Sequence, residues 1–385
     1  MRWPTAKLGK VAPSKPLKAP SNLDELDVWQ LNLDMIESQS GRVLGKLKAP
    51  PSQAGSSTHW FTDKHVLYSK LRPYLNKVVL PDEQGIATTE LVPMLPDPEK
   101  LERRYLAHYL RSEKFVNWVT EQVAGAKMPR VSMKVFWDHE IPLPPLEEQK
   151  RIAAILDKAD EIRSKRQEAI ELADEFLRSV FLDMFGDPVT NPKEWQLKPL
   201  KEIAKVTTGN TPSRKEEKFY GNHVEWIKSD NINTPSHFLT LASEYLSEEG
   251  AKAGRIVPKG STLVTCIAGS FDCIGNAAYA DRDVAFNQQI NALTPKKGVS
   301  SWFLYALILF SKKNIQASST NSMKGMVSKG KMEEILMISP PESKQIEFEK
   351  SFLSYLKLIS DMVISLNDSN ELLSSLCQKA FRGIL

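Results

Sequence analysis

The sequence has few of the residues that disulfide-bonded, metal-binding or membrane-spanning proteins require. Its 385 residues include only three cysteines (Cys266, Cys273 and Cys377), too few for a disulfide framework and typical of a reduced compartment. The longest apolar run, Trp302 to Phe310, is far shorter than the ~20 residues that span a bilayer. The N-terminal segment has no apolar core, so it predicts no secretory signal. We therefore expect a soluble, cytoplasmic protein without a membrane partner.

Motifs that would indicate catalysis are missing as well. There is no Asn/Asp-Pro-Pro-aromatic turn of an amino-methyltransferase and no Gly-x-Gly-x-x-Gly turn. Residues 325–332 resemble a phosphate-binding loop, but Met332 stands where a Ser or Thr should ligate magnesium. Cys266 and Cys273 are spaced too widely for a typical zinc pair. We therefore expect both cysteines to be buried and to pack as small apolar side chains. We expect no catalytic residue, no metal site and no cofactor.

What the chain does contain is an internal repeat at a separation of 196 residues. Val131-Ser132 matches Val327-Ser328, and Pro144-Pro145 matches Pro340-Pro341. Further matches follow without a gap: Gln149 with Gln345, Glu175 with Glu371, Leu177 with Leu373, and Phe185 with Phe381. Upstream the separation drifts to 199 and 192, as insertions in loops would cause. Chance similarity is the alternative, but the ungapped stretch favours duplication of a unit of about 190 residues.

Each repeat begins with an irregular part that contains short β-like runs. These runs are rich in Val, Thr and aromatic residues and lie between turn residues, which predicts strands. They are His65–Tyr68, Lys77–Leu80, Thr262–Ile267 and Asn276–Tyr279. A helical segment follows in each repeat, at residues 99–123 and 301–316. Both globular parts are therefore predicted to be mixed α/β.

Each repeat ends in a long amphipathic helix that begins after a proline pair. We expect the two helices to pack through apolar residues at steps of three and four, with a flanking stripe that includes Leu156 and Leu177. The packing positions are Ile152, Ile155, Ile162, Phe176, Val180, Phe348, Leu358, Leu372 and Leu376. About 40 residues make a helix of roughly 60 Å, for which its own repeat copy is the natural antiparallel partner. Two independent helices, each on its own domain, are the alternative.

The predicted fold class is therefore α+β: two pseudo-repeated mixed α/β domains separated by two long helices packed as an antiparallel coiled coil. The expected domains are residues 1–145, the central helix 146–186, residues 187–341 and the C-terminal helix 342–385. A formal net charge of only +4 would argue weakly against a nucleic-acid partner. Divided by domain, however, residues 1–145 hold 20 Lys/Arg against 16 Asp/Glu, and residues 191–341 hold 19 against 14, whereas 146–190 hold 7 against 11. A phosphate-binding surface would thus lie on the globular parts.

Cationic and amide side chains recur beside turns and aromatic residues in both globular parts. Arg and Lys suit guanine edges and phosphates, and Asn and Gln suit adenine, although any single one of these residues can equally be a solvated loop residue. The candidate DNA-binding residues are Lys70, Arg72, Tyr74, Lys127, Arg130, Thr211, Ser213, Arg214, Lys215, Lys228, Ser229, Asn231, Asn287, Gln288 and Lys324.

The chain resembles the specificity subunits of type I restriction-modification systems. The similarity rests on the strings Ile141-Pro-Leu-Pro-Pro-Leu-Glu-Glu-Gln-Lys-Arg-Ile-Ala153 and Leu67-Tyr-Ser-Lys-Leu-Arg-Pro-Tyr74, and on two globular parts that each precede a Pro-Pro-x-x-x-Gln helix. The second copy departs from the pattern, because Ile267-Ala-Gly-Ser270 replaces Lys70-Leu-Arg-Pro73. The two globular parts should therefore recognise different sequences.

The resemblance implies two target-recognition domains that each read half of a bipartite site in double-stranded DNA. The helices would fix the spacer and dock two modification subunits, and restriction subunits would join the complex. Methyl donor and ATP would bind those partners, so the chain itself would need no cofactor and would not be an enzyme. One alternative is an architectural protein that assembles through its helices and does not read DNA. Another is an enzyme with an unrecognised site.

Overall fold

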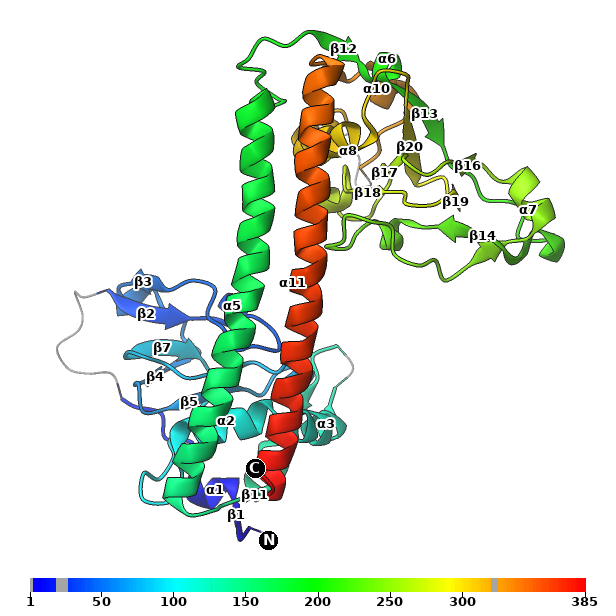
Figure 1. Cartoon of the computed structure of the whole chain (residues 1–385). Helices are drawn as coiled ribbons and strands as arrows, with labels where there is room; N and C mark the ends of the chain where they lie inside the picture. Colours follow the sequence, from blue (N-terminus) through cyan, green and yellow to red (C-terminus); the bar gives the residue numbers. More distant parts are fainter. Residues whose placement is uncertain (1–2, 19–26, 126, 320–324) are drawn as a thin grey trace. The chain divides into compact units, whose positions relative to one another are not determined.

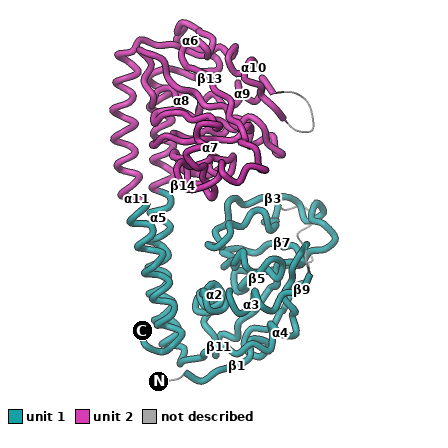
Figure 2. Tube along the Cα trace, turned by 90° about the vertical axis from the view of Figure 1, so that its right-hand side faces the viewer, with its two compact units in different colours: residues 1–168, 363–385 teal, residues 169–362 magenta. Residues whose placement is uncertain are grey.

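The computed structural model describes residues 3–18, 27–125, 127–319 and 325–385. The chain divides into two compact units (Figure 2). Unit 1 comprises residues 1–168 and 363–385, and unit 2 comprises residues 169–362. Each unit therefore contains one globular part together with a portion of each long helix.

Unit 1 contains two main sheets. In the four-stranded sheet, β2 and β7 are parallel and the other neighbours are antiparallel, and the three-stranded sheet is antiparallel throughout. In sheet order, the strands are β3 (Leu47–Ala49), β2 (Val28–Leu31), β7 (Gly85–Thr88) and β4 (Thr58–Phe61), then β6 (Val78–Val79), β5 (Val66–Ser69) and β8 (Leu91–Met94). The remaining elements are β1 (Thr5–Lys7), β11 (Glu140–Pro142), β9 (Val123–Ala124), β10 (Arg130–Val131), α1 (Leu8–Val11), α2 (Arg103–Arg111), α3 (Glu113–Glu121) and α4 (Met133–Asp138).

Unit 2 has the same plan, but its antiparallel sheet has four strands where that of unit 1 has three. One sheet is antiparallel, and the other contains the parallel pair β14 and β19. In sheet order, the strands are β13 (Ala204–Thr208), β20 (Ile290–Pro295), β17 (Thr262–Thr265) and β18 (Ala277–Tyr279), then β15 (Tyr245–Leu246), β14 (Tyr220–Ile227), β19 (Val284–Phe286) and β16 (Ile256–Val257). The remaining elements are β12 (Leu197–Pro199), β21 (Leu336–Ile338), α6 (Leu200–Ile203), α7 (Glu248–Ala253), α8 (Ser301–Phe310), α9 (Lys312–Ala317) and α10 (Lys329–Glu334).

The strand registers confirm the internal repeat. In unit 1, Val66 of β5 lies opposite Met94 of β8. In unit 2, Thr262 of β17 lies opposite Leu293 of β20, at separations of 196 and 199 residues from those two positions. The bridge between Leu71 and Arg130 likewise recurs as a bridge between Ile267 and Met326, at a separation of 196 for both partners. The repeat separation thus changes between 196 and 199 residues along the chain, while the strand pairing is the same in both copies.

The glutamine of each Pro-Pro-x-x-x-Gln string is a buried anchor. The side chain of Gln149 is fully buried; its Oε1 accepts from the Glu102 backbone N–H at 2.9 Å, and its Nε2 donates to the Lys100 and Pro144 carbonyls at 2.9 and 2.8 Å. Gln345 makes the equivalent bonds in unit 2, accepting from Ser300 N at 3.0 Å and donating to the Pro340 carbonyl at 2.8 Å. Glu102 and Ser300 are the N-cap residues of α2 and α8. Each glutamine therefore ties the start of a long helix to the start of a helix in its own globular part.

The two long helices are α5 (Leu146–Phe185) and α11 (Glu342–Arg382), and they pack side by side in opposite directions (Figure 1). In unit 1, Arg166 of α5 donates to the Ser365 carbonyl at 2.6 Å and to the Ser369 hydroxyl. In unit 2, Tyr355 of α11 donates to Asp174 of α5, and the Phe181 and Phe348 rings lie 5.4 Å apart. The expectation of an antiparallel pair is confirmed.

The packing face predicted for these helices was only partly right. Ile152 and Phe348 are buried, and Ile155, Val180 and Leu376 are partly buried. Four other predicted positions are exposed by 40% or more: Ile162, Phe176, Leu358 and Leu372. The flanking stripe supplies the core positions instead, among them Leu156 and Leu177. The reason is that each helix also packs against the globular part of its unit, which rotates the buried face away from these four side chains.

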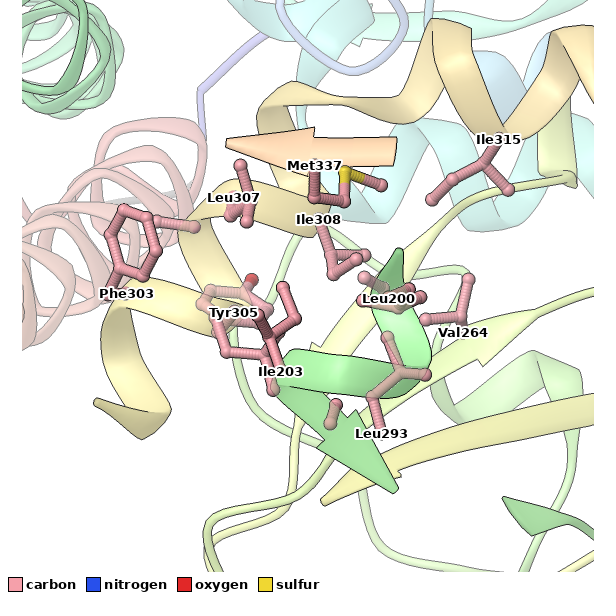
Figure 3. Packing of buried hydrophobic residues seen from close by; sticks show 14 of the residues in the cluster. Leu200, Ile203, Val264, Leu293, Phe303, Tyr305, Leu307, Ile308, Ile315 and Met337 are labelled. Carbon is pink, nitrogen blue, oxygen red and sulfur yellow. The ribbon is translucent and has the colours of Figure 1, made fainter. Parts of the chain in front are cut away.

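Each helical segment predicted inside the globular parts is broken in two. Ser112 ends α2 and caps α3, and Ser311 separates α8 from α9. The core of unit 2 forms around α8, where Phe303, Tyr305, Leu307 and Ile308 meet β-strand residues such as Val264 and Leu293 (Figure 3). These cores leave the loops at the strand ends as the places where polar side chains can gather.

Candidate nucleic-acid interface

In unit 1, two candidate segments that are distant in the sequence lie side by side. The loop 70–76 leaves β5 and pairs with the hairpin of β9 and β10. The Arg72 backbone N–H donates to the Pro129 carbonyl at 2.8 Å, and Val131 N–H donates to the Lys70 carbonyl at 3.1 Å. Lys70, Arg72, Lys127 and Arg130 are thereby brought to one edge of the unit.

The loop 70–76 has an unusual backbone. Arg72 and Asn76 both adopt left-handed conformations, with φ of 47° and 51°, on either side of the 3-10 turn η3 (Pro73–Leu75). Non-glycine residues adopt this conformation at a cost, and such sites are often functional. Arg72 is exposed and forms no salt bridge within the described parts of the chain, and Tyr74 is 41% exposed. The loop therefore presents a cation and an aromatic ring to solvent.

Arg130 differs from Arg72 because it is paired with a carboxylate. Its Nη2 lies 3.0 Å from Glu90 Oε1, and its Nε also donates to Glu90. The Arg130 hydrogen bond keeps the pKa of Glu90 below its usual value, with Lys70 nearby as a weaker cause. At neutral pH this pair is therefore ionised and its charges cancel.

In unit 2, the candidates gather from three loops. Thr211 donates to Gln288, and the Arg214 guanidinium lies over the rings of Tyr220 and Trp226, 4.6 and 4.9 Å from their centroids. Gly209 permits this arrangement, since a Cβ at that position would lie 2.1 Å from the Asn287 carbonyl oxygen. The loop 209–215 is thereby seated between β14 and the turn 287–289.

One carboxylate holds two of these cations. Glu244 accepts from Arg214 Nη1 at 2.6 Å through Oε2 and from Lys228 Nζ through Oε1. Lys228 Nζ also lies 5.4 Å from the centre of the Trp226 ring. Hydrogen bonds from Arg214 and Lys228 lower the pKa of Glu244. The result is a compact cluster of two cations, one anion and two aromatic rings.

Some candidates have other structural roles. Asn287 is buried, and its side chain bonds Gln289 within the turn, so it is not available to a base edge. The Asn231 amide donates to the Leu241 carbonyl at 2.9 Å and so holds its own loop. Thr211, Ser213, Lys215 and Gln288 are exposed, Ser229 is partly exposed, and Lys324 lies outside the described residues. For the exposed members, DNA contact stays a prediction.

The sequence did not point to Glu90 or Glu244. Each lies far along the chain from the cations it pairs with, and neither belongs to a recognisable motif. Within the described residues, no group of three or more His, Cys, Asp or Glu side chains is placed to hold a metal ion. No helix among the described residues is long and apolar enough to cross a membrane.

The sequence profile of the family described as "Type I restriction modification DNA specificity domain" matches residues 59–172 and 192–360. The chain belongs to this family. The two matches fall on the two copies of the repeat, so the type I specificity domain occurs twice.

Curated relatives in the type I specificity family are named as specificity subunits. The MjaIX specificity subunit of Methanocaldococcus jannaschii is 32% identical over 201 residues, which cover 50% of this chain and 44% of the relative. The EcoDI specificity subunit of Escherichia coli is 25% identical over 193 residues, covering 49% and 42%. These matches thus span less than half the length of either relative. Their names agree with the prediction of a specificity subunit.

Solved structures have the same fold as this type I specificity chain. The S subunit of a type I system from M. genitalium aligns with a TM-score of 0.58 at 14% identity and covers 98% of this chain and 96% of the other. A chain from a study of type I complex assembly and conformational transition also gives 0.58, at 19% identity, and covers 100% and 98%. The predicted fold class is confirmed over the whole chain.

Proposed function

We propose that the chain is the DNA sequence-specificity subunit of a type I restriction-modification complex that works in the cytoplasm. Each unit would read one half of a bipartite site in double-stranded DNA. The observation that carries the proposal is the repeat itself, because two copies of one scaffold present different polar loops at the ends of equivalent strands. The same backbone can then recognise two unrelated half-sites.

In unit 1, the proposed DNA contacts are Lys70, Arg72, Tyr74, Lys127 and Arg130. In unit 2 they are Thr211, Ser213, Arg214, Lys215, Lys228, Ser229 and Gln288. Exposed cations beside aromatic rings suit both phosphates and guanine edges. Recognition of bases in this way needs no cofactor, so methyl donor and ATP would belong to partner subunits.

The long helices would set the spacer and dock two modification subunits, to which restriction subunits would add. Support for docking comes from exposed apolar side chains on the helical portions of unit 2. They are Leu172 (57% exposed), Phe176 (67%), Leu353 (45%) and Leu358 (50%). Large apolar side chains in water at neighbouring positions are typical of a protein interface.

The proposal is tested by coexpressing the chain with a modification subunit and mapping methylated bases in the host genome. The expected result is a split motif with a fixed gap, and adding one heptad to both helices should change the gap and leave both half-sites intact. An undivided motif, or half-sites that change with helix length, would contradict it.

The second candidate is an architectural protein that assembles through α5 and α11 and does not read DNA. The same exposed apolar residues favour it. Salt dependence separates the two functions, because a DNA-binding chain loses affinity as the logarithm of salt rises, with a slope set by its phosphate contacts. An architectural protein would give no such slope.

A further inference from the structure

In the candidate DNA-binding surface of unit 2, a single carboxylate pairs with two cations and cancels one of their two positive charges. Glu244 pairs with both Arg214 and Lys228, and all three side chains are accessible, with exposures of 31%, 53% and 30% respectively. DNA can therefore reach the cluster. A phosphate that approaches the cluster competes with the carboxylate for both cations.

The aromatic rings keep the cations in place independently of Glu244. Trp226 is buried, and its indole N–H donates to the Asn210 carbonyl at 3.2 Å, which fixes the ring. The Arg214 guanidinium rests on this ring and on Tyr220, and Lys228 Nζ lies near the same indole. The ring face attracts a cation whether or not a carboxylate is also present. Glu244 therefore contributes charge more than position.

Unit 1 contains a smaller version of the same arrangement. Glu90 forms a forked pair with Arg130. Glu90 holds one cation where Glu244 holds two, and Arg72 beside it is exposed and outside any salt bridge among the described residues. The two units thus pair different numbers of their candidate cations.

We propose that Glu244 and Glu90 are specificity-determining residues, which suppress binding to arbitrary DNA by neutralising the cations of the recognition loops. This inference rests on the proposed function. An unpaired cation attracts any phosphate, whatever the sequence, and this attraction dominates non-specific binding. A paired cation is released only where the fit to the target supplies enough other contacts to replace the carboxylate. Loss of the carboxylate should therefore strengthen non-specific binding more than target binding.

The test measures the affinity of the full-length chain for a random-sequence duplex, by fluorescence anisotropy over a range of salt concentrations. Glu244→Gln keeps the shape of the side chain and releases two cations. Each new phosphate contact adds about 0.9 to the slope of log affinity against log salt. We expect the slope to steepen by up to about 1.8 for Glu244→Gln and by about 0.9 for Glu90→Gln. Over a fourfold change in salt, a slope change of 1.8 corresponds to roughly a tenfold larger change in affinity.

The matched control is Glu334→Gln, which also removes one negative charge and one pair. Glu334 accepts from Lys201 at 2.6 Å, and neither residue is a candidate DNA contact. We expect its slope to stay at the wild-type value. Thermal unfolding of all three variants should match the wild type, and Glu244→Asp should restore most of the wild-type slope.

The outcomes separate this inference from the proposed function. If the wild-type chain shows no salt-dependent DNA binding, the proposed function fails. If the wild type binds DNA and Glu244→Gln and Glu90→Gln leave the slope unchanged or reduce it, the specificity role of the carboxylates is overturned. If Glu334→Gln steepens the slope as much as Glu90→Gln, net charge explains the effect and the inference is likewise overturned.

Discussion

Units 1 and 2 share a scaffold and differ where they present side chains to solvent. The shared part extends to single hydrogen bonds, since Gln149 and Gln345 make two equivalent hydrogen bonds at the starts of α5 and α11. The loops do not match, and the strand pairing corrects the expected correspondence by one residue: Lys70-Leu-Arg-Pro73 in unit 1 lies over Cys266-Ile-Ala-Gly269 in unit 2, not over Ile267–Ser270. The unit 2 segment has no cation in either register. Unit 2 takes its cations from the loop 209–215 and from Lys228. Under the proposed function, such different loops on one repeated scaffold would let the two units read half-sites of different sequence.

The largest expected effect is on stability, at equivalent positions of the repeat that differ in burial. Phe185 and Phe381 are repeat equivalents, but Phe185 is fully buried against Phe303 and Phe348, whereas Phe381 is only partly buried beside Tyr105 and Tyr109. We expect Phe185→Ala to cost about 3–5 kcal/mol of unfolding free energy, because it leaves a cavity. Phe381→Ala should cost less.

Denaturant unfolding combined with hydrogen exchange measures this difference unit by unit. Phe176→Ala is the control on the same helix, and since Phe176 is 67% exposed we expect a change within about 0.5 kcal/mol. An equal loss for Phe176→Ala and Phe185→Ala would show that the buried face of α5 has been assigned incorrectly.

The next effect tests whether the anchoring glutamines are equivalent. Replacing either Gln149 or Gln345 by Ala leaves buried backbone groups without a partner, at about 1–3 kcal/mol each. We expect Gln149→Ala to cost more than Gln345→Ala, because Gln149 also bonds the Lys100 carbonyl. Hydrogen exchange at the first turns of α2 and α8 should rise in the matching unit. Faster hydrogen exchange in the other unit instead would contradict the anchoring role of these glutamines.

A smaller effect distinguishes the exposed cation of unit 1 from its paired neighbour. Arg72→Ala should reduce the salt slope of DNA binding by about 0.9, the contribution of one phosphate contact. Arg130→Ala should reduce it less, because Glu90 already neutralises Arg130. Equilibrium binding of a random-sequence duplex provides the measurement. Equal changes for the two variants would remove the distinction between paired and unpaired cations.

The smallest effect is a difference in acid sensitivity. In unit 1, burial lowers the pKa of His59 and of His139 to about 4 and also lowers the pKa of His65. In unit 2, burial lowers the pKa of His237. The neutral forms stabilise the folded state above the ordinary histidine pKa of 6.5, and this stabilisation is lost as the pH falls towards 4.

We therefore expect hydrogen-exchange protection to fall more in unit 1 than in unit 2 between about pH 7 and pH 5. His139→Gln should reduce the difference, since it removes one titrating group. A larger loss in unit 2 would contradict the assignment.

Much of the fold could be predicted from the sequence because the repeat constrains it twice. Local sequence patterns predicted the strands near Val66 and Thr262 and the helix starts after the proline pairs. These elements depend mainly on neighbouring residues. The buried face of the long helices was harder to predict. Phe176 and Leu177 are both apolar, and packing against the globular part determines which of the two side chains is buried. The breaks at Ser112 and Ser311 were missed, although serine is a favoured N-cap residue and charged residues follow both serines.

The sequence predicted the cations of the candidate site but not the carboxylates that pair with them. Lys70 with Arg130, and Thr211 with Gln288, were proposed separately, and the fold brings them together. Glu244 could not be found, since its distance along the chain from Arg214 and Lys228 carries no pattern. Asn287 was mistaken for a base contact, because a buried turn amide and an exposed one look alike in sequence.

Mapping methylated bases in hosts that express the chain with a modification subunit tests whether one scaffold carries two independent recognition surfaces. Wild type, Arg72→Ala and Arg214→Ala should be compared. We predict a split motif in which Arg72→Ala relaxes one half and Arg214→Ala relaxes the other. An undivided motif, or two variants that alter the same bases, would contradict it.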